Sequence, residues 1–373
     1  MAPLAAEHLP AGVRARLLPG VNGLDVHVLE AGFETAGRPA VLLLHGFPEL
    51  AYSWRKVMPA LAQAGYHAIA PDQRGYGRTT GWSADYDADL APFRFLNLVR
   101  DALGVLAACG HRSAHAVVGH DFGASVAAWA ALVRPDVFQR LVLMSAPFGG
   151  PPPLAPARGP DIHAALAALP RPRKHYQWYY STRPANADMW RAPQGVHDFL
   201  RAYYHHKSAD WAANRPFELA GWTADELAKM PTYYIMDLAE TMAGTVAHEM
   251  PTSAEIAGCS WLPEHELRVY SDEYARSGFQ GGLNWYRVRT SRAFDGELEL
   301  FAARTIDVPA AFIAGASDWG IRQSPGALDR MRDRACTRMG PPRLIDGAGH
   351  WVQQERPTET TRLLLEFLGG RQS

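Results

Sequence analysis

The segment Gly119-His120-Asp121-Phe122-Gly123 places a carboxylate between two glycines. It follows the apolar run 115–118, which predicts a buried strand, and it precedes the small-residue run 124–133, which predicts a helix. A strand, a tight turn around a nucleophile and a helix form a nucleophile elbow, which is usually built around serine. An aspartate in that position can attack a saturated carbon and leave an alkyl ester on the protein. The segment therefore predicts that Asp121 is the nucleophile of a hydrolase that opens C–O or C–halogen bonds.

A histidine and a second carboxylate complete the chemistry that such an ester requires. His350, in Gly347-Ala348-Gly349-His350-Trp351, follows a short predicted strand and can act as the base that activates water. Asp318 follows the predicted strand 311–314 and can orient this histidine. The order nucleophile, acid, histidine is that of the α/β-hydrolase triad. Asp346 is a rival acid, but its place just before His350 is more typical of a turn or surface residue.

Backbone N–H groups close to Asp121 can stabilise the negative charge that develops on the ester. The segment His45-Gly46-Phe47-Pro48 follows the predicted strand 41–44, and a loop in that position normally supplies one donor. The residue after the nucleophile normally supplies the other. We therefore assign an oxyanion hole to the N–H groups of Phe47 and Phe122, and we expect His45 to anchor its loop.

The elements that position these residues alternate between strand and helix along the chain. Strands are predicted over 13–18, 24–30, 41–44, 67–70, 115–118, 141–144, 309–314 and 344–345. Helices are predicted over 54–64, 93–109, 124–133 and 357–368, and another begins at Ser324-Pro325. This alternation predicts an α/β fold with a mostly parallel sheet and helices on both faces. Asp121, Asp318 and His350 all follow strands, so they should meet at the carboxyl edge of the sheet.

The alternation stops after the strand that follows the elbow helix. Residues 147–160 contain six prolines and three glycines, which predicts a stiff linker. The stretch 161–298 shows no strand pattern, and helices are predicted over 161–169, 195–204, 223–230 and 235–247. We therefore predict a core from 1–147 and 299–373, with residues 148–298 inserted as a helical cap.

Composition narrows the kinds of partner that the chain can have. A net charge of −1 gives no electrostatic reason to bind nucleic acid or an anionic membrane. No apolar run reaches the roughly 18 residues of a membrane span, and residues 1–20 contain no signal-peptide core. The three cysteines are scattered and match neither a metal site nor a disulfide framework. We expect a cytoplasmic protein without a metal, and its oligomeric state is not predictable from these features.

Four motifs together resemble the epoxide hydrolases of the α/β-hydrolase fold. They are His45-Gly46-Phe47-Pro48-Glu49, Asp72-Gln73-Arg74-Gly75-Tyr76-Gly77, Gly119-His120-Asp121 and Gly349-His350-Trp351. The resemblance covers nearly the whole core, over residues 12–150 and 300–370. It implies that the substrates are water and a small or medium apolar epoxide, that the product is a vicinal diol, and that no cofactor takes part.

In that family, two tyrosines of the cap hold the epoxide oxygen. The resemblance assigns these roles to Tyr286, in Leu283-Asn284-Trp285-Tyr286-Arg287, and to Tyr176. Tyr179 and Tyr180 are close neighbours of Tyr176 and are alternatives for the first tyrosine. A phenol has an ordinary pKa of about 10, so it remains protonated at neutral pH and can donate to an alkoxide. The residues expected to contact the substrate are Trp54, Phe122, Tyr179, Tyr180 and Trp351.

Two other readings of the same motifs are possible. A haloalkane dehalogenase shares the aspartate nucleophile, but that family carries a tryptophan N–H donor directly after it, where this chain has Phe122. A non-catalytic ligand-binding member of the fold would keep the pocket and lose the triad, whereas Asp121, Asp318 and His350 are all present. The cap segment 221–260 is longer than we expect for epoxide hydrolases, so the shape of the substrate pocket is not predictable.

Overall fold

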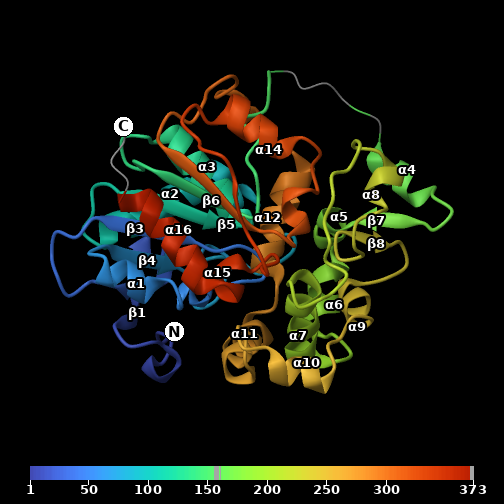
Figure 1. Ribbon diagram of the computed structural model, residues 1–373, viewed down its shortest axis with the longest axis horizontal. Helices are drawn as coiled ribbons and strands as arrows, with labels where there is room; N and C mark the ends of the chain where they lie inside the picture. Colours follow the sequence, from blue (N-terminus) through green and yellow to red (C-terminus); the bar gives the residue numbers. More distant parts are fainter. Residues whose placement is uncertain (155–158, 160, 370–373) are drawn as a thin grey trace.

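The computed structural model of the chain describes residues 1–154, 159 and 161–369. Residues 155–158 and 160 of the predicted proline-rich linker lie outside this part of the chain, and its described residues 147–154 contain no helix or strand. Figure 1 shows the central sheet with its helices and, beside it, the mainly helical cap.

Eight strands of the described residues form one sheet, in the order β1-β2-β4-β3-β5-β6-β9-β10. The β1–β2 and β2–β4 pairs are antiparallel, and all other neighbours are parallel. The strands are β1 (Val13–Val21), β2 (Leu24–Ala31), β3 (Ala40–Leu44), β4 (His67–Pro71), β5 (Ala116–His120), β6 (Leu141–Met144), β9 (Ala310–Gly315) and β10 (Arg343–Ile345). The predicted mostly parallel sheet is therefore confirmed.

Helices cover both faces of this sheet because its inner strands are apolar on both sides. Every residue of β3, β5 and β6 is buried, as is typical of parallel strands between two helical layers. One face packs against α1 and α16, and the other packs against α2 and α3. The helices of the core are α1 (Met58–Gln63), α2 (Phe95–Ala108), α3 (Phe122–Val133), α14 (Ala327–Arg330), α15 (Val352–Glu355) and α16 (Pro357–Gly369). Shorter 3₁₀ or π turns are Ala6–His8, Ala51–Trp54, Ala91–Phe93, Trp319–Ile321 and Met331–Ala335.

The helix predicted over 54–64 is shorter than expected. Residues Ala51–Trp54 form a 3₁₀ turn, and α1 begins only at Met58. Pro59 explains the start of α1, because proline lacks an N–H group and fits only in the first turn of a helix.

The cap contains a small sheet that the sequence pattern did not predict. β7 (Arg173–His175) pairs with the antiparallel strand β8 (Ile235–Asp237). The helix predicted over 235–247 is therefore wrong in its first half: α9 begins at Met242, where the side chain of Thr241 accepts a hydrogen bond from the N–H of Gly244. Strands of three residues are too short to show alternation, and their pairing joins segments that are distant in the sequence.

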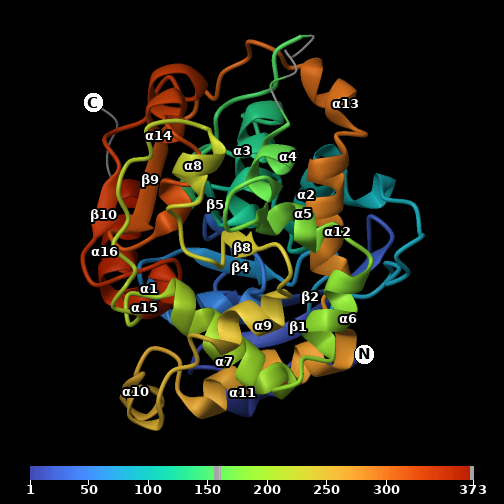
Figure 2. The same ribbon diagram turned by 90° about the vertical axis from the view of Figure 1, so that its right-hand side faces the viewer.

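The rest of the cap is helical, as predicted. Figure 2 shows β8, α5 and α7 in front of the core when the molecule is seen from the cap side. The cap helices are α4 (Ile162–Ala167), α5 (Tyr176–Tyr180), α6 (Pro184–Trp190), α7 (Gly195–Lys207), α8 (Ala224–Leu227), α9 (Met242–Ala247), α10 (Ser253–Gly258), α11 (Glu264–Ser277), α12 (Gln280–Ser291) and α13 (Asp295–Glu299).

Candidate active site

Asp121 lies in a strained turn between β5 and α3. Its backbone has φ 52° and ψ −121°, a conformation that non-glycine residues rarely adopt and that costs on the order of 1 kcal/mol. The flanking glycines are required by close packing, because a Cβ at Gly119 would collide with the backbone of Gly123. A Cβ at Gly123 would collide in turn with the backbone of Leu44 in β3. This packing holds the Asp121 side chain at the carboxyl edge of the sheet.

The three residues of the predicted triad meet at this edge. His350 Nδ1 lies 3.1 Å from Asp318 Oδ1, and its Nε2 lies 3.3 Å from Asp121 Oδ2. The carboxylate of Asp318 also accepts a hydrogen bond of 2.7 Å from the N–H of Gly320. Because Nδ1–H donates to Asp318, Nε2 faces the nucleophile, and it has no hydrogen-bond partner among the described residues. This nitrogen is thus free to take a proton from water.

The surroundings of Asp121 favour its ionised form. Burial by itself would raise the pKa of this carboxyl group. The imidazole of His350 and the positive charges of Lys207 and His120 outweigh burial and hold the pKa well below its ordinary value. The N–H of Phe47 donates a hydrogen bond of 3.0 Å to Asp121 Oδ1, which leaves Oδ2 for attack. The N–H of Phe122 is in the first turn of α3, where N–H groups have no intrahelical partner.

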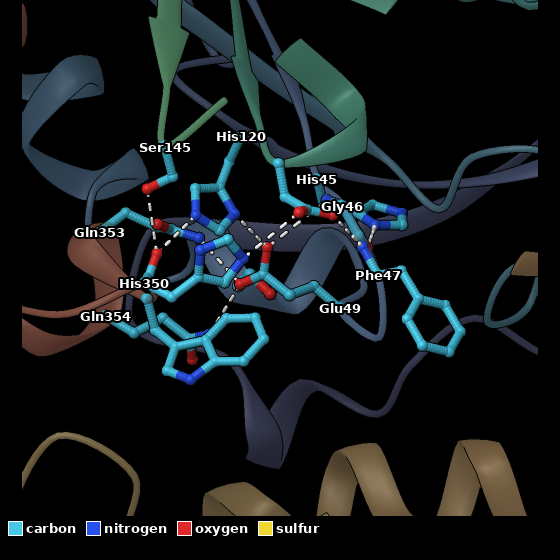
Figure 3. A network of polar contacts seen from close by, with 12 residues as sticks. His45, Gly46, Phe47, Glu49, His120, Ser145, His350, Gln353 and Gln354 are labelled. Atoms are coloured by element: carbon cyan, nitrogen blue, oxygen red, sulfur yellow. Dashed lines mark hydrogen bonds and ion pairs between the residues drawn. The ribbon is translucent and has the colours of Figure 1, made fainter. Parts of the chain in front are cut away.

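A fully buried ion pair between His120 and Glu49 supports the backbone of His350 (Figure 3). His120 Nε2 donates a hydrogen bond of 2.7 Å to the carbonyl oxygen of His350, and its Nδ1 lies 2.6 Å from Glu49 Oε2. Burial lowers the pKa of His120, but the charge and hydrogen bond of Glu49 outweigh it, so the net pKa is raised. The side-chain amides of Gln353 and Gln354 donate to Glu49 Oε1 at 2.8 and 2.9 Å. Both charges therefore have partners, as buried charges require.

The loop that carries His350 is also held against the cap. The N–H of His350 donates a hydrogen bond of 3.0 Å to the carbonyl oxygen of Lys207, the last residue of α7. Gly349 lies so close to the cap backbone that an added Cβ would be within 2.6 Å of Ser208 and Ala209 backbone atoms. The position of His350 is thus tied to one end of α7.

Glu355, a residue of the core, stabilises the same contact between the His350 loop and the cap. Its Oε2 accepts hydrogen bonds of 2.8 Å from the N–H groups of Gly349 and Ala209, and its Oε1 accepts one of 2.9 Å from Trp351. One carboxylate therefore binds both neighbours of His350 and the cap. Burial raises the pKa of Glu355 to about 7, although the three N–H donors oppose that shift. Sequence reasoning missed this residue, because its role depends on a cap segment that is distant in the sequence.

Glu355→Gln is expected to slow hydrolysis of the ester more than its formation. The amide nitrogen would face a backbone N–H group, and a buried donor without an acceptor costs about 1–3 kcal/mol. We expect the rate of ester breakdown to fall roughly 10-fold, measured by rapid-quench kinetics with mass detection of the alkylated protein. Glu366→Gln, on the exposed side of α16, is the control. Equal losses in the rates of ester formation and ester breakdown would show that Glu355 contributes only to the stability of the fold.

Tyr176 and Tyr286 face Asp121 from the cap. Tyr176 follows β7 directly, Tyr286 lies in α12, and their ring centres are 6.0 Å apart. Burial and the negative charge of Asp121 raise the pKa of both phenols above its ordinary value, so both remain proton donors. The side-chain amide of Gln177 donates a hydrogen bond of 3.1 Å to the Tyr176 oxygen, which leaves the phenolic hydrogen free.

A cavity of about 430 Å³ joins the nucleophile to the two tyrosines. Its wall is partly apolar and partly polar, because aromatic rings, amides, hydroxyls and arginines all contribute to it. Trp222, from the long cap segment 221–260, is one of these rings. The cavity is lined by Asp121, Phe122, Ser125, Ala146, Pro147, Gly149, His175, Tyr176, Gln177, Trp178, Trp222, Tyr286, Arg289, Thr290, Arg292, Asp295, Gly320, Gln323, Ser324, Ala327 and Arg330.

Tyr179 and Tyr180 are placed differently from Tyr176. The hydroxyl of Tyr179 donates to Asp188, and that of Tyr180 donates to Tyr203. Neither residue lines the cavity, although the ring of Tyr180 packs against that of Tyr286 at 5.0 Å. Of the three neighbouring tyrosines, only Tyr176 shares the cavity with Asp121.

The predicted substrate contacts of the two tryptophans need correction. Trp54 is fully buried in the apolar cluster between the sheet and helices α1 and α16, so it cannot reach the cavity. Trp351 is also fully buried: its ring packs against His350 at 4.7 Å, and its N–H donates to the carbonyl oxygen of Tyr204. Both tryptophan side chains are therefore part of the core and do not line the cavity.

The described residues contain neither a metal-binding cluster nor a membrane-spanning helix. Among residues 1–154, 159 and 161–369, no group of three or more His, Cys, Asp or Glu side chains is arranged to hold a metal ion. No helix in the same part of the chain is both long and apolar enough to cross a membrane.

Comparison with known proteins gives one consistent result. Residues 39–357 match the family described as alpha/beta hydrolase fold. The chain is 36% identical to epoxide hydrolase A of Mycobacterium tuberculosis, over 96% of this chain and 98% of that protein. It is similar to the structure of an epoxide hydrolase from an endophytic Streptomyces, with a TM-score of 0.76 and 33% identity over 97% and 96% of the two chains. Potato (Solanum tuberosum) epoxide hydrolase I gives a TM-score of 0.71 and 29% identity over 96% and 99%.

Proposed function

The chain belongs to the epoxide hydrolases of the α/β-hydrolase fold, and from that premise we propose that it opens an epoxide with an apolar body to a vicinal diol through an alkyl ester on Asp121. One observation carries the proposal: a carboxylate with a depressed pKa and two protonated phenols face each other across a single cavity. A nucleophile on one side and acids on the other are what the opening of a strained C–O bond requires.

The first half of the reaction forms the ester. Oδ2 of Asp121 attacks one carbon of the ring while Oδ1 stays hydrogen-bonded to the N–H of Phe47. The C–O bond breaks, and the leaving oxygen takes hydrogen bonds and then a proton from Tyr176 or Tyr286. Rings such as Phe122, Trp178 and Trp222 would contact the apolar body of the substrate.

The second half of the reaction releases the diol. His350 Nε2 takes a proton from water, and the resulting hydroxide attacks the Asp121 carboxyl carbon rather than the substrate. Negative charge develops on Oδ1, to which the N–H of Phe47 donates and toward which we assign the N–H of Phe122, and Asp318 stabilises the imidazolium that forms. The ester bond then breaks, and the two protons of the consumed water, held by His350 and by the Asp121 carboxyl group, pass to the alkoxide of the diol and to the tyrosinate left by the first half-reaction. The diol leaves with Asp121, His350 and the tyrosine in their starting forms.

Product analysis separates this function from the alternatives. Incubation with styrene oxide should give the diol, whereas incubation with bromobutane should release no bromide. A single turnover in heavy-oxygen water should label the protein at Asp121 and leave the first diol unlabelled. Label in the diol would mean direct attack by water, and bromide without diol would mean a dehalogenase. The side chain of Phe122, which has no N–H donor for a halide, argues against the dehalogenase.

Tyr286→Phe is expected to slow ester formation at the low end of the roughly 10²–10⁴-fold range for a positioned acid, because Tyr176 remains. Tyr176→Phe/Tyr286→Phe should lose far more, because the alkoxide then has neither donor. Both rates are measured by stopped-flow spectroscopy with styrene oxide. Tyr179→Phe is the matched control, since its hydroxyl donates to Asp188 outside the cavity. Near wild-type turnover by the double variant would refute the assignment of both tyrosines.

A further inference from the structure

The wall of the cavity carries more positive charge than an apolar epoxide needs. Three arginines line it: Arg289 and Arg292 at the end of α12, and Arg330 at the end of α14. Two carboxylates line it as well, and each already has a partner. Arg292 Nε lies 2.7 Å from Asp295 Oδ2, and Asp121 Oδ1 accepts a hydrogen bond of 3.0 Å from the N–H of Phe47.

The other two arginines have no carboxylate partner among the residues that the structure describes. Arg330 donates a hydrogen bond of 2.9 Å to the carbonyl oxygen of Pro325, which leaves its charge unbalanced. The side chain of Arg289 forms neither a hydrogen bond nor an ion pair with any residue that the structure describes. Its guanidinium lies over the ring of Phe122 at a distance of 5.9 Å. His175 also lines the cavity, but burial lowers its pKa to about 3, so it is neutral. The open part of the cavity is therefore positively charged.

Arg289 lies near the residues of the proposed mechanism. It follows Tyr286 by three positions in α12, so both side chains project from the same side of the helix. Its guanidinium carbon lies 5.9 Å from the centre of the Phe122 ring, next to the nucleophile. Its charge also acts on Tyr176, because it favours the ionised form of that phenol. Arg289 thus lines the cavity near Phe122 and is exposed to solvent, so its guanidinium is accessible to an incoming anion.

Given the proposed epoxide hydrolysis, on which this inference rests, we propose that the cavity selects epoxides that carry a carboxylate, and that Arg289 is the residue that binds this carboxylate. A guanidinium matches a carboxylate with two parallel hydrogen bonds, and its N–H groups here are not engaged elsewhere. Three residues of helix, a rise of about 4.5 Å, separate Arg289 from Tyr286, so the acid should lie a short distance from the epoxide ring. Arg330 strengthens the field at the mouth of the cavity. The substrate is then amphipathic rather than purely apolar.

Pairs of substrates that differ only in charge test this inference. Phenylglycidate is compared with phenylglycidamide, and a terminal epoxyhexanoate with its amide, in the wild type and in Arg289→Met. The wild type should prefer each acid in kcat/KM, and Arg289→Met should lose roughly 10- to 100-fold of that preference, mainly through KM. Arg289→Lys should keep part of the preference, and added salt should weaken it in the wild type. Arg191→Met removes an exposed cap arginine outside the cavity and is the control for net charge.

The possible outcomes are distinct. Equal turnover of acid and amide by the wild type, or an unchanged preference in Arg289→Met, would overturn the inference while leaving epoxide hydrolysis intact. Equal rate losses on acid, amide and styrene oxide would show instead that Arg289 serves the alkoxide, and would also overturn it. A protein that converts none of these compounds, styrene oxide included, would refute the proposed function itself.

Discussion

Asp121→Asn is expected to abolish turnover of every epoxide, with a loss on the order of 10⁴-fold or more. The amide is a far weaker nucleophile than a carboxylate whose pKa lies below its ordinary value. The replacement has nearly the same shape, so its carbonyl oxygen can still accept from the N–H of Phe47. Diol formation from styrene oxide, followed by chromatography, measures the loss.

The control for this variant is Asp346→Asn, which changes the exposed carboxylate near His350. It should retain the wild-type rate. Residual activity of Asp121→Asn above a few per cent would count against the ester mechanism, unless mass spectrometry of the purified variant detects deamidation back to aspartate.

His350→Gln is expected to stop the enzyme after the first half-reaction. In the proposed mechanism, ester formation uses Asp121, the backbone N–H groups and the tyrosines, whereas ester hydrolysis uses the base at His350 Nε2. Loss of a positioned base costs about 10²–10⁴-fold, so the ester should accumulate. Intact-protein mass spectrometry under saturating styrene oxide should therefore find the variant heavier by one substrate molecule.

The same experiment on two further variants makes this result specific. Asp121→Asn/His350→Gln should remain unmodified, because it has no nucleophile. Peptide mapping of the single variant should locate the added mass at Asp121. If His350→Gln stays unmodified while it still releases diol slowly, water is activated by another group and His350 is not the hydrolytic base.

Sequence alone was sufficient where one short segment determines the geometry. The elbow around Asp121 follows from two glycines and an apolar strand, and both glycines prove necessary because the backbones of β3, β5 and α3 nearly touch. The inner strands of the sheet were predictable for a similar reason, because strands buried on both sides consist of continuous apolar runs. That Asp121, Asp318 and His350 lie together could be predicted from their order along the chain and from the strand that precedes each of them.

Other features depend on contacts between distant segments, and no local pattern reveals them. The β7–β8 pair places Tyr176 at the cavity, yet each strand is only three residues long. Glu355 looks like one more glutamate near a helix start, and only the folded chain brings Gly349, Trp351 and Ala209 to it. Trp54 shows the opposite error: it was expected to contact the substrate, but it fills the core.

The pairing of β6 with β9 bears on how such a protein can change during evolution. These strands are hydrogen-bonded neighbours, although about 165 residues of chain leave the sheet between them. The entropy of closing a loop grows only with the logarithm of its length, so closing this one costs about 2 kcal/mol more than closing a loop of about 20 residues. A change in the length or sequence of the segment between β6 and β9 therefore costs the sheet little stability, provided that the contact between Gly349, His350 and the end of α7 at Lys207 is preserved. Substrate range can diverge by insertion and recombination while the hydrolytic apparatus is inherited intact.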